Sequence, residues 1–600
     1  FETKSENTDQ DRTVMPLLDG WLALPIGALC SGPEWRSLWG ISDLPVRMAT
    51  ALAGANPSLA HFVTITRGNH VLLVVWSLSL LKPLGVFYVT SGTPTEFDFE
   101  ATNAVTVASP ATAAYRDKNV SAPWFASRIG ERWFIGNGID DNLQWYGGAL
   151  SLLGPTIAPA DSELYNMSRV KFPPCTTFTM GGTKSIFAAG NAAQPKRVWI
   201  AHPPTSDYPF NEGIYSLTSS FIDILYSEAT RVTALTAFNN YVTAHTDAKP
   251  VNLFDVDGTN DGWKCVQAPG AANSSAPSPA AVRDTNGIAS FYLGADGEVY
   301  EDQSIRVGPY DKRAARDQDV ATKLGASDWN RDMLRPVAAG KSHTIYDRTH
   351  QLFWMFAELD ALPGRFGIWA YNERSRGVMG PFTHLNAVAS CAIPGPKETY
   401  AAVITGGGQL LFADLSNIGE TSEFMNEPPN MPLFPEFAEL DAEPTPTPGL
   451  SFVAMTANNR VIKEVSADGT ALLMVDPWSY FETQGTYTYT KFFKDAYVAR
   501  FETEVTDFGS ADLIKNYLEL RVTLQHHSRA YLGLYAEADG DETKLRGGKW
   551  HGLVFNRQTH RIALNLSGRR IRVRCVAILF NSAPTMIRDV TIGWMPAGST

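Results

Sequence analysis

The feature that most constrains the fold is a hairpin unit that recurs between His61 and Phe412. Each unit is a run of alternating apolar and polar residues, a short polar turn and a second alternating run, which is typical of paired half-buried strands. About seven units follow one another at roughly 40–65 residues, the spacing of propeller blades with loop insertions. We therefore expect an all-β chain with a β-propeller of about six to eight irregular blades, and a pair of β-sandwiches is the competing arrangement. The units are 61–66 with 70–76, 124–129 with 132–137, 186–190 with 197–202, 233–238 with 241–245, 288–293 with 298–300, 343–346 with 351–356, and 400–404 with 409–412.

A second strand-rich region lies at the C-terminal end. Alternating runs cover 497–509, 517–524, 530–535 and 561–574, and Asp539-Gly540 is a hairpin-type turn. The Pro-rich stretch 426–449 is expected to be an extended linker, and a helix is expected at 312–324, before Gly325. The expected domains are an N-terminal arm with a Trp-rich docking segment at 1–50, the propeller at 51–425, the linker with connecting strands at 426–490, and a C-terminal β-sandwich at 491–600.

Charge and cysteine content argue against several classes of protein. A net charge of −12 over 600 residues disfavours a protein built to grip nucleic acid, because phosphate binding needs an excess of Lys and Arg. The longest apolar run, 71–81, is much shorter than the ~20 residues of a membrane span. No signal peptide is visible, and whether a segment precedes Phe1 stays open. None of the cysteines has CxxC spacing, so neither a zinc site nor a disulfide framework is indicated; they are Cys30, Cys175, Cys265, Cys391 and Cys575.

No stretch carries a recognisable catalytic motif. The segment Asp255-Val-Asp-Gly-Thr-Asn-Asp-Gly262 offers oxygen ligands suited to calcium, but Thr259 and Asn260 break the EF-hand pattern, and a tight turn is the simpler interpretation. Gly181-Gly182 and Gly406-Gly-Gly408 lack the Lys-Ser/Thr of a phosphate loop and are expected to be hairpin turns. None of the 11 histidines lies in an HExxH motif. The sequence therefore predicts no catalytic, cofactor-binding or metal-binding residue, no cofactor and no enzyme.

Two segments have both a structural and a partner-binding interpretation. Residues 15–40 contain three tryptophans among Gly and Pro, which fits either a buried N-terminal cap or a docking segment for a neighbouring subunit. Arg570, Arg572 and Arg574 share one face of a strand. This arginine stripe either pairs with nearby Glu and Asp or contacts an acidic partner.

Two stretches carry a resemblance to a known family. Tyr346-Asp-Arg-Thr-His-Gln-Leu-Phe-Trp-Met-Phe356, followed by Gly367-Ile-Trp-Ala-Tyr-Asn-Glu-Arg-Ser-Arg-Gly-Val-Met-Gly-Pro-Phe382, is similar to a blade signature of phage tail propellers. The region 497–592 resembles the small sandwich that closes such proteins. With the Trp-rich opening, these stretches resemble the tail nozzle (tail tubular protein B-like) and tail-hub proteins of short-tailed phages. Val378-Met379 departs from the signature, which usually has Trp there.

The resemblance implies a structural virion protein, made in the host cytoplasm, that forms a homohexameric ring at the tail tube and conducts the genome during ejection. It implies contacts with tail adaptor, tube and fibre proteins, and passage of double-stranded DNA without specific binding. No active-site residue carries over from the family. The alternative is a host-surface propeller that binds or cleaves carbohydrate.

Overall fold

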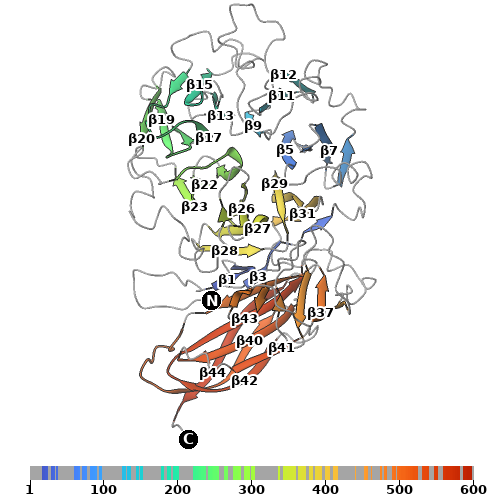
Figure 1. Cartoon of the computed structure of the whole chain (residues 1–600), viewed down its shortest axis with the longest axis vertical. Helices are drawn as coiled ribbons and strands as arrows, with labels where there is room; N and C mark the ends of the chain where they lie inside the picture. The colour runs from blue at the N-terminus through green and yellow to red at the C-terminus, as the bar shows by residue number, and fades with distance from the viewer. Residues whose placement is uncertain are drawn as a thin grey trace, which may run out of the picture.

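The computed structural model of the chain is an assembly of antiparallel sheets (Figure 1). Apart from one short 3-10 turn, η5 (Pro279–Ala281), the elements of the described residues are strands. The structure describes residues 17–23, 29–33, 35–37, 60–67, 70–77, 82–90, 93–97, 125–129, 132–136, 143–146, 149–152, 178–180, 186–190, 194–201, 221–237, 241–255, 263–267, 274–284, 289–297, 299–303, 336–337, 342–359, 362–372, 377–382, 385–394, 399–405, 410–415, 439–440, 452–456, 461–462, 473–475, 479–482, 489–494, 496–503, 505–524, 530–539, 546–551, 559–580 and 585–597.

Within these residues, seven sheets between 60 and 414 form the blades of a β-propeller. Blades one to three are β5 (Ala60–Arg67), β6 (His70–Ser77), β7 (Lys82–Thr90) and β8 (Thr93–Phe97); β9 (Phe125–Ile129), β10 (Arg132–Gly136), β11 (Leu143–Tyr146) and β12 (Ala149–Leu152); and β13 (Phe178–Met180), β14 (Ile186–Ala189), β15 (Arg197–Ala201) and β16 (Phe221–Asp223). Blades four and five are β17 (Val232–Ala237), β18 (Tyr241–Thr246), β19 (Val251–Asp255) and β20 (Trp263–Gln267); and β21 (Val282–Asp284), β22 (Ala289–Leu293) and β23 (Val299–Gln303).

The last two blades lie next to the C-terminal domain (Figure 1). Blade six holds β24 (Pro336–Val337), β25 (His343–Asp347), β26 (Leu352–Leu359), β27 (Leu362–Asn372) and β28 (Gly377–Phe382). Blade seven holds β29 (Ala387–Pro394), β30 (Thr399–Thr405), β31 (Leu410–Asp414) and, from the N-terminal region, β4 (Arg36–Ser37).

The ring of blades is closed. One strand of each blade contacts its counterpart in the next, in the cycle β5, β9, β13, β17, β21, β25, β29 and back to β5. The seventh blade therefore adjoins the first, and sheet-on-sheet contacts continue around the ring, as in other propellers.

The seven expected hairpin units are confirmed, one in each blade. In blade one, for example, Arg67 lies opposite His70 across a two-residue turn. In blade five the turn before Val299 closes with a hydrogen bond from the Gly297 amide to the Gly294 carbonyl, 2.9 Å long. Gly297 has a φ of 82°, which glycine adopts without steric cost.

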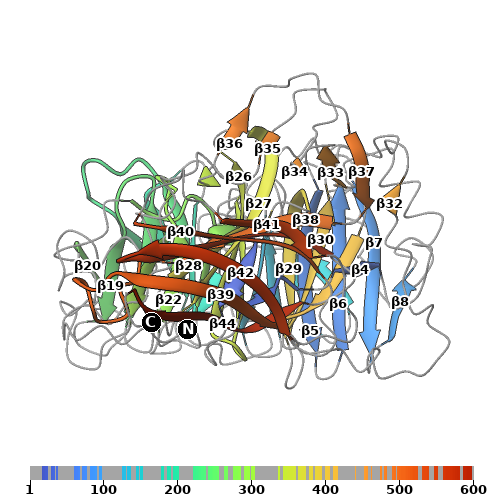
Figure 2. The ribbon, with the colours of Figure 1, turned by 90° about the horizontal axis from the view of Figure 1, so that it is seen from below.

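The C-terminal domain is a sandwich of two five-stranded sheets, whose strands run across the front of the molecule in the view from below (Figure 2). Sheet A has the order β1 (Leu17–Asp19), β38 (Ala496–Glu502), β43 (Ile571–Phe580), β40 (Ala530–Ala538) and β41 (Arg546–His551). Sheet B has the order β2 (Trp21–Ala23), β3 (Leu29–Ser31), β44 (Met586–Pro596), β39 (Lys515–Leu524) and β42 (Thr559–Gly568). Along β39, burial alternates between residues, as expected for a strand with one face on a core.

The described part of the N-terminal region differs from the docking segment expected within 1–50, and the expected arm at its start lies outside the described residues. Residues 17–37 supply β1 to sheet A, β2 and β3 to sheet B, and β4 to blade seven. Trp21 and Trp35 are buried within the chain, so the described part of this segment is the buried cap that the sequence also allowed. Trp39 lies outside the described residues.

One hydrophobic core joins the two domains. Trp354 and Phe382 of blade six pack against each other with ring centroids 6.2 Å apart, and Phe382 meets Tyr497 of sheet A at 6.3 Å. These residues belong to the same cluster of buried side chains as the interior of the sandwich. The sandwich is therefore packed directly on the propeller.

The connection between the domains contains two further small sheets. One has the order β32 (Glu439–Leu440), β37 (Tyr489–Lys494), β33 (Phe452–Thr456) and β34 (Val461–Ile462), and the other pairs β35 (Leu473–Val475) with β36 (Ser479–Glu482). The predicted helix at 312–324 and most of the predicted Pro-rich linker lie outside the described residues.

Candidate interaction site

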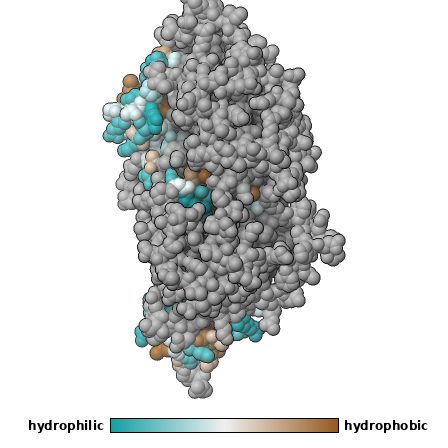
Figure 3. Space-filling view, turned by 45° about the vertical axis from the view of Figure 1, so that its right-hand side comes forward, coloured by the Kyte–Doolittle hydropathy of each residue, from teal (hydrophilic) through white to brown (hydrophobic). Residues whose placement is uncertain are grey.

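Five exposed apolar side chains gather at one end of the sandwich, and we call this cluster the sandwich tip. It comprises Phe508, Leu513, Ile514, Leu518 and Met595. Among the described residues, Leu225 is the one other exposed large hydrophobic side chain. In Figure 3, brown side chains stand among teal ones at the lower end of the molecule, where the sandwich lies. Clustered exposed apolar residues of this kind are typical of protein–protein contact surfaces.

The loop that carries Phe508, Leu513 and Ile514 of the tip is held in place by a buried lysine, and the other two tip residues lie on β39 and β44. The Lys515 ammonium donates hydrogen bonds to the carbonyls of Ser510, Leu513 and Arg569, at 2.6, 3.2 and 3.1 Å. Lys515 is fully buried, and its ammonium lies 5.5 Å from the centre of the Trp594 ring, so it also gains cation–π attraction. The tip is therefore presented by an anchored turn.

Phe508 shows local backbone strain. Its φ of 51° is unusual for a bulky residue, yet its ring stacks on Trp594 with centroids 5.8 Å apart. The Asp507 carboxylate accepts a hydrogen bond of 2.9 Å from the Gly509 amide, which supports this turn. Strain of about 1–3 kcal/mol persists only when surrounding contacts impose it.

Tyr517 lies beside the tip and keeps a neutral hydroxyl. Burial, followed by the charges of Asp539 and Asp507, raises the pKa of Tyr517 to about 12. The Asp539 carboxylate accepts hydrogen bonds from the Arg569 and Arg570 amides, at 2.7 and 3.0 Å, and so fixes the adjacent turn. The tip therefore combines exposed apolar side chains with both acidic and basic residues nearby.

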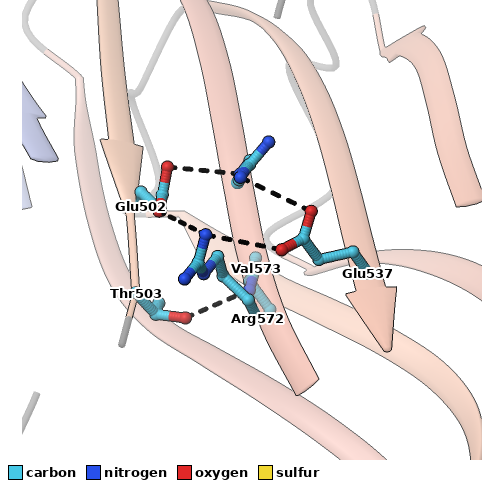
Figure 4. Close-up of polar contacts among 6 residues, drawn as sticks. Glu502, Thr503, Glu537, Arg572 and Val573 are labelled. Carbon is cyan, nitrogen blue, oxygen red and sulfur yellow. Dashed lines mark hydrogen bonds and ion pairs between the residues drawn. The ribbon is translucent and has the colours of Figure 1, made fainter. Parts of the chain in front are cut away.

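The arginine stripe is used inside sheet A. Arg572 contacts Glu502 at 3.0 Å and Glu537 at 3.4 Å (Figure 4). Arg574 contacts the same two carboxylates at 3.2 and 3.4 Å. Both arginines lie on β43, between β38 with Glu502 and β40 with Glu537. Two positive and two negative charges form a balanced network, which corresponds to the ion-pair interpretation of Arg572 and Arg574.

A buried polar network connects blade four to the segment that enters blade five. The His245 Nδ1 lies 3.2 Å from the Ser275 hydroxyl and accepts a hydrogen bond of 3.3 Å from the Ala276 amide. Its Nε2 therefore carries the proton and lies 3.3 Å from the Thr236 hydroxyl. A histidine beside a serine can activate a nucleophile, but both side chains are buried. The network therefore stabilises the junction between the blades. No sequence motif predicts it.

The sequence-predicted ligand and turn segments lie, apart from Asp255, outside the described residues, and the described strands flank them. Asp255 of β19 pairs with Trp263 of β20, so residues 256–262, which lie outside the described part of the chain, connect two paired strands. The glycines at 181–182 follow β13, whose Met180 pairs with Ile186, and those at 406–408 lie between the paired Ile404 and Leu410. Within the described residues, no group of three or more His, Cys, Asp or Glu side chains is arranged to hold a metal ion. In that same part of the chain, no helix has the length and apolar character to cross a membrane.

The comparisons with known proteins concern the fold alone. No protein-family model and no curated protein sequence matches the chain. Among solved structures, the chain is similar to the PorZ component of the type-IX secretion system of Porphyromonas gingivalis, at 11% identity and a TM-score of 0.36, over 73% of this chain and 57% of PorZ. It is also similar to the Pan2 WD40 domain of Neurospora crassa, at 10% identity and a TM-score of 0.34, over 64% of this chain and 97% of that domain. A third similar structure is the computationally designed Ika8 protein, at 10% identity and a TM-score of 0.33, over 64% of this chain and all of Ika8. The fold class, an all-β propeller with a C-terminal sandwich, follows from the sheet topology and the contacts between blades, and we draw no argument from these likenesses.

Proposed function

We propose that the chain is a structural component of a phage tail, of the nozzle or hub type, that assembles as a ring at the tail tube and conducts the genome. The proposal rests on the resemblance of the blade and sandwich stretches to that family. The observation that carries it furthest is the sandwich tip, an anchored surface with five exposed apolar side chains of the kind that protein assemblies bury.

The two stretches that carry the resemblance are in contact with each other. The blade signature covers β25 to β28, and its Trp354 and Phe382 pack in one core with Tyr497 of the sandwich. Met379, at the departure from the signature, is buried in the same core, so an apolar side chain still fills that position. This supports the interpretation of the two stretches as parts of one architecture rather than two chance matches.

The partner that we propose for the tip is a second copy of the chain. Head-to-tail contacts between identical subunits close into rings when their rotation allows it. The two other surfaces considered for this contact are used internally, because Trp21 and Trp35 are buried and the arginines of the stripe at 572 and 574 pair with Glu502 and Glu537. The tip is the exposed apolar surface that the described residues leave for such a contact.

The oligomeric mass of the purified chain tests this proposal. We expect native mass spectrometry of the purified chain to give a closed oligomer, and Ile514→Asp to reduce it to monomers, because a charge would be buried without a partner. The matched control is Leu225→Asp, which places the same charge at a side chain that is 88% exposed on the propeller. A chain that stays monomeric at high concentration and occurs once per particle would exclude the ring, and an oligomer unaffected by Ile514→Asp would exclude the tip.

A further inference from the structure

The N-terminal residues 17–37, which we call the strap, connect three sheets that are otherwise built from distant parts of the chain. The strap runs along sheet A as β1, turns at Gly20, enters sheet B as β2 and β3, and reaches blade seven as β4. Gly20 has a φ of 72°, and a Cβ there would lie 2.9 Å from the Cβ of Ala499. The crossing between the two sheets of the sandwich is therefore a close approach that requires glycine.

The middle of the strap lies at the junction of the domains (Figure 1). The Gly32 amide donates a hydrogen bond of 2.9 Å to the Tyr497 hydroxyl of sheet A. A Cβ at Gly32 would lie 3.0 Å from the ring of Phe382 in blade six. Burial raises the pKa of Tyr497, so its hydroxyl stays neutral and available to Gly32. One residue of the strap, Gly32, thus contacts both the sandwich and the propeller.

The two ends of the strap are held unequally. Its sandwich end pairs at Leu17, Leu18 and Asp19 with β38, and β2 pairs with β3. Ser31 adds two hydrogen bonds with Thr585, an amide-to-carbonyl bond of 2.8 Å and a bond of 2.9 Å from the Thr585 amide to the serine hydroxyl. Among the described residues, its propeller end pairs at two positions of β31, Ser37 with Leu411 and Arg36 with Phe412.

Among the described residues, the aromatic side chain of Trp35 also supports this end. Trp35 is buried and packs edge-on against Phe356 of blade six, with ring centroids 6.5 Å apart. β4 covers the outer edge of β31 in blade seven. An uncovered strand edge presents unpaired backbone groups that can pair with another chain.

We propose that the strap is a latch that opens from its propeller end: β4 and Trp35 leave blade seven and expose the edge of β31, while β1 to β3 stay in the sandwich. Local opening takes place where contacts are fewest, and here the propeller end has the shorter pairing. The device couples the two domains in the closed state and uncovers the edge of β31 in the open state. This inference does not depend on the proposed tail function.

Hydrogen exchange of the full-length chain, read by mass spectrometry, tests the latch. In the wild-type chain we expect the amides of 410–414 to exchange at least about tenfold faster than those of 497–501. Trp35→Ala should accelerate exchange at 410–414 further and leave 497–501 unchanged. The matched control is Trp199→Ala, which removes a buried tryptophan from blade three and should leave 410–414 unchanged.

A disulfide between β4 and β31 provides a second test of the latch, which applies even if Trp35→Ala does not fold. Ser37→Cys with Leu411→Cys places cysteines at paired positions of β4 and β31. Oxidation should slow exchange at 410–414 at least about tenfold in the folded protein, and reduction should reverse the effect. Loss of protection at 17–31 together with 410–414 would overturn the proposal, because the strap would then leave as one unit. Unchanged exchange at 410–414 on oxidation would overturn it as well.

Discussion

At the residue scale, the arginine stripe shows what an alternating pattern does and does not specify. The alternation predicts that Arg572 and Arg574 share a face, and the structure places both beside Glu502 and Glu537. The partners could not be read from the sequence, because Glu502 and Glu537 lie on strands that pair with β43 only through the topology of sheet A. Pairing between distant strands is set by the whole sheet rather than by local residues.

The buried member of this network is expected to be its most sensitive position. The Glu537 side chain has no exposed surface and contacts both arginines. Glu537→Ala leaves two partly buried guanidinium groups with one carboxylate, so we expect a loss of about 3 kcal/mol in the free energy of unfolding. Denaturant titration of the sandwich transition measures it.

The control for this variant is Glu519→Ala, which breaks the Arg521–Glu519 pair on the outer face of sheet B. Ion pairs in contact with solvent contribute little, so this change should leave the unfolding midpoint close to that of the wild-type chain. Equal losses of unfolding free energy in the two variants would show that the network of Arg572, Arg574, Glu502 and Glu537 contributes no more than a solvent-exposed ion pair.

The thiol of Cys30 provides a second test at this scale. Burial raises the pKa of Cys30, and the reactive species of a cysteine is its thiolate. At pH 8 we therefore expect a water-soluble alkylating reagent to leave Cys30 unmodified in the native chain and to modify it after denaturation. Peptide mapping by mass spectrometry measures both, and rapid native modification would contradict the burial of β3.

At the scale of elements, the hairpins were predictable and the strap was not. Each hairpin, such as β5 with β6, is specified by alternation and a short turn within about 20 residues of sequence, so local pattern suffices. The strap pairs Leu17 with Glu502 and Ser37 with Leu411. These partners are hundreds of residues away, and the Trp-rich composition of the segment shows only that it is buried against something.

Two glycines with the same φ allow two costs of adding a side chain at the strap crossing to be measured separately, the strain of a left-handed backbone and the steric contact with a neighbouring strand. Gly20 and Gly509 both have a φ of 72°, but a Cβ at Gly20 would meet Ala499, whereas a Cβ at Gly509 would meet no atom within 4 Å. Gly509→Ala should cost about 1–2 kcal/mol for the left-handed backbone. Gly20→Ala should cost about 3 kcal/mol, because the backbone of the crossing must also shift. Thermal unfolding of both variants measures the difference, and equal costs would show that the approach to Ala499 is relaxed in solution.

At the scale of the whole molecule, the sequence predicted the two kinds of domain but not their union in one core. Phe382, Tyr497 and Trp21 come from the propeller, the sandwich and the N-terminal region, yet all three are buried in the same cluster. The residue pattern of each segment predicts only a strand with one apolar face. It does not predict that the three segments pack against one another. The sandwich tip was also missed, because exposure of Phe508 or Ile514 depends on how the loop is anchored by Lys515.

The charge of the whole molecule leads to a prediction about DNA. Every Lys or Arg that contacts phosphate releases counterions and adds affinity, which would slow a passing genome. The net charge is −12, and the ion-pair network neutralises Arg572 and Arg574 within the chain. We therefore expect acidic and neutral side chains, not a continuous band of Lys and Arg, to line any channel that the proposed ring forms.

Fluorescence anisotropy with labelled duplex DNA checks this expectation. The purified chain should show no retention of DNA at micromolar concentration and physiological ionic strength. Asp512→Lys, at an exposed position of the tip loop, serves as a control, because added positive charge should produce only weak, salt-sensitive binding. Micromolar DNA binding by the wild-type chain that weakens steeply with salt would contradict the prediction that the channel lining does not bind DNA. It would direct the search for a phosphate contact to Arg569 and Arg570, which are exposed at the end of the arginine stripe.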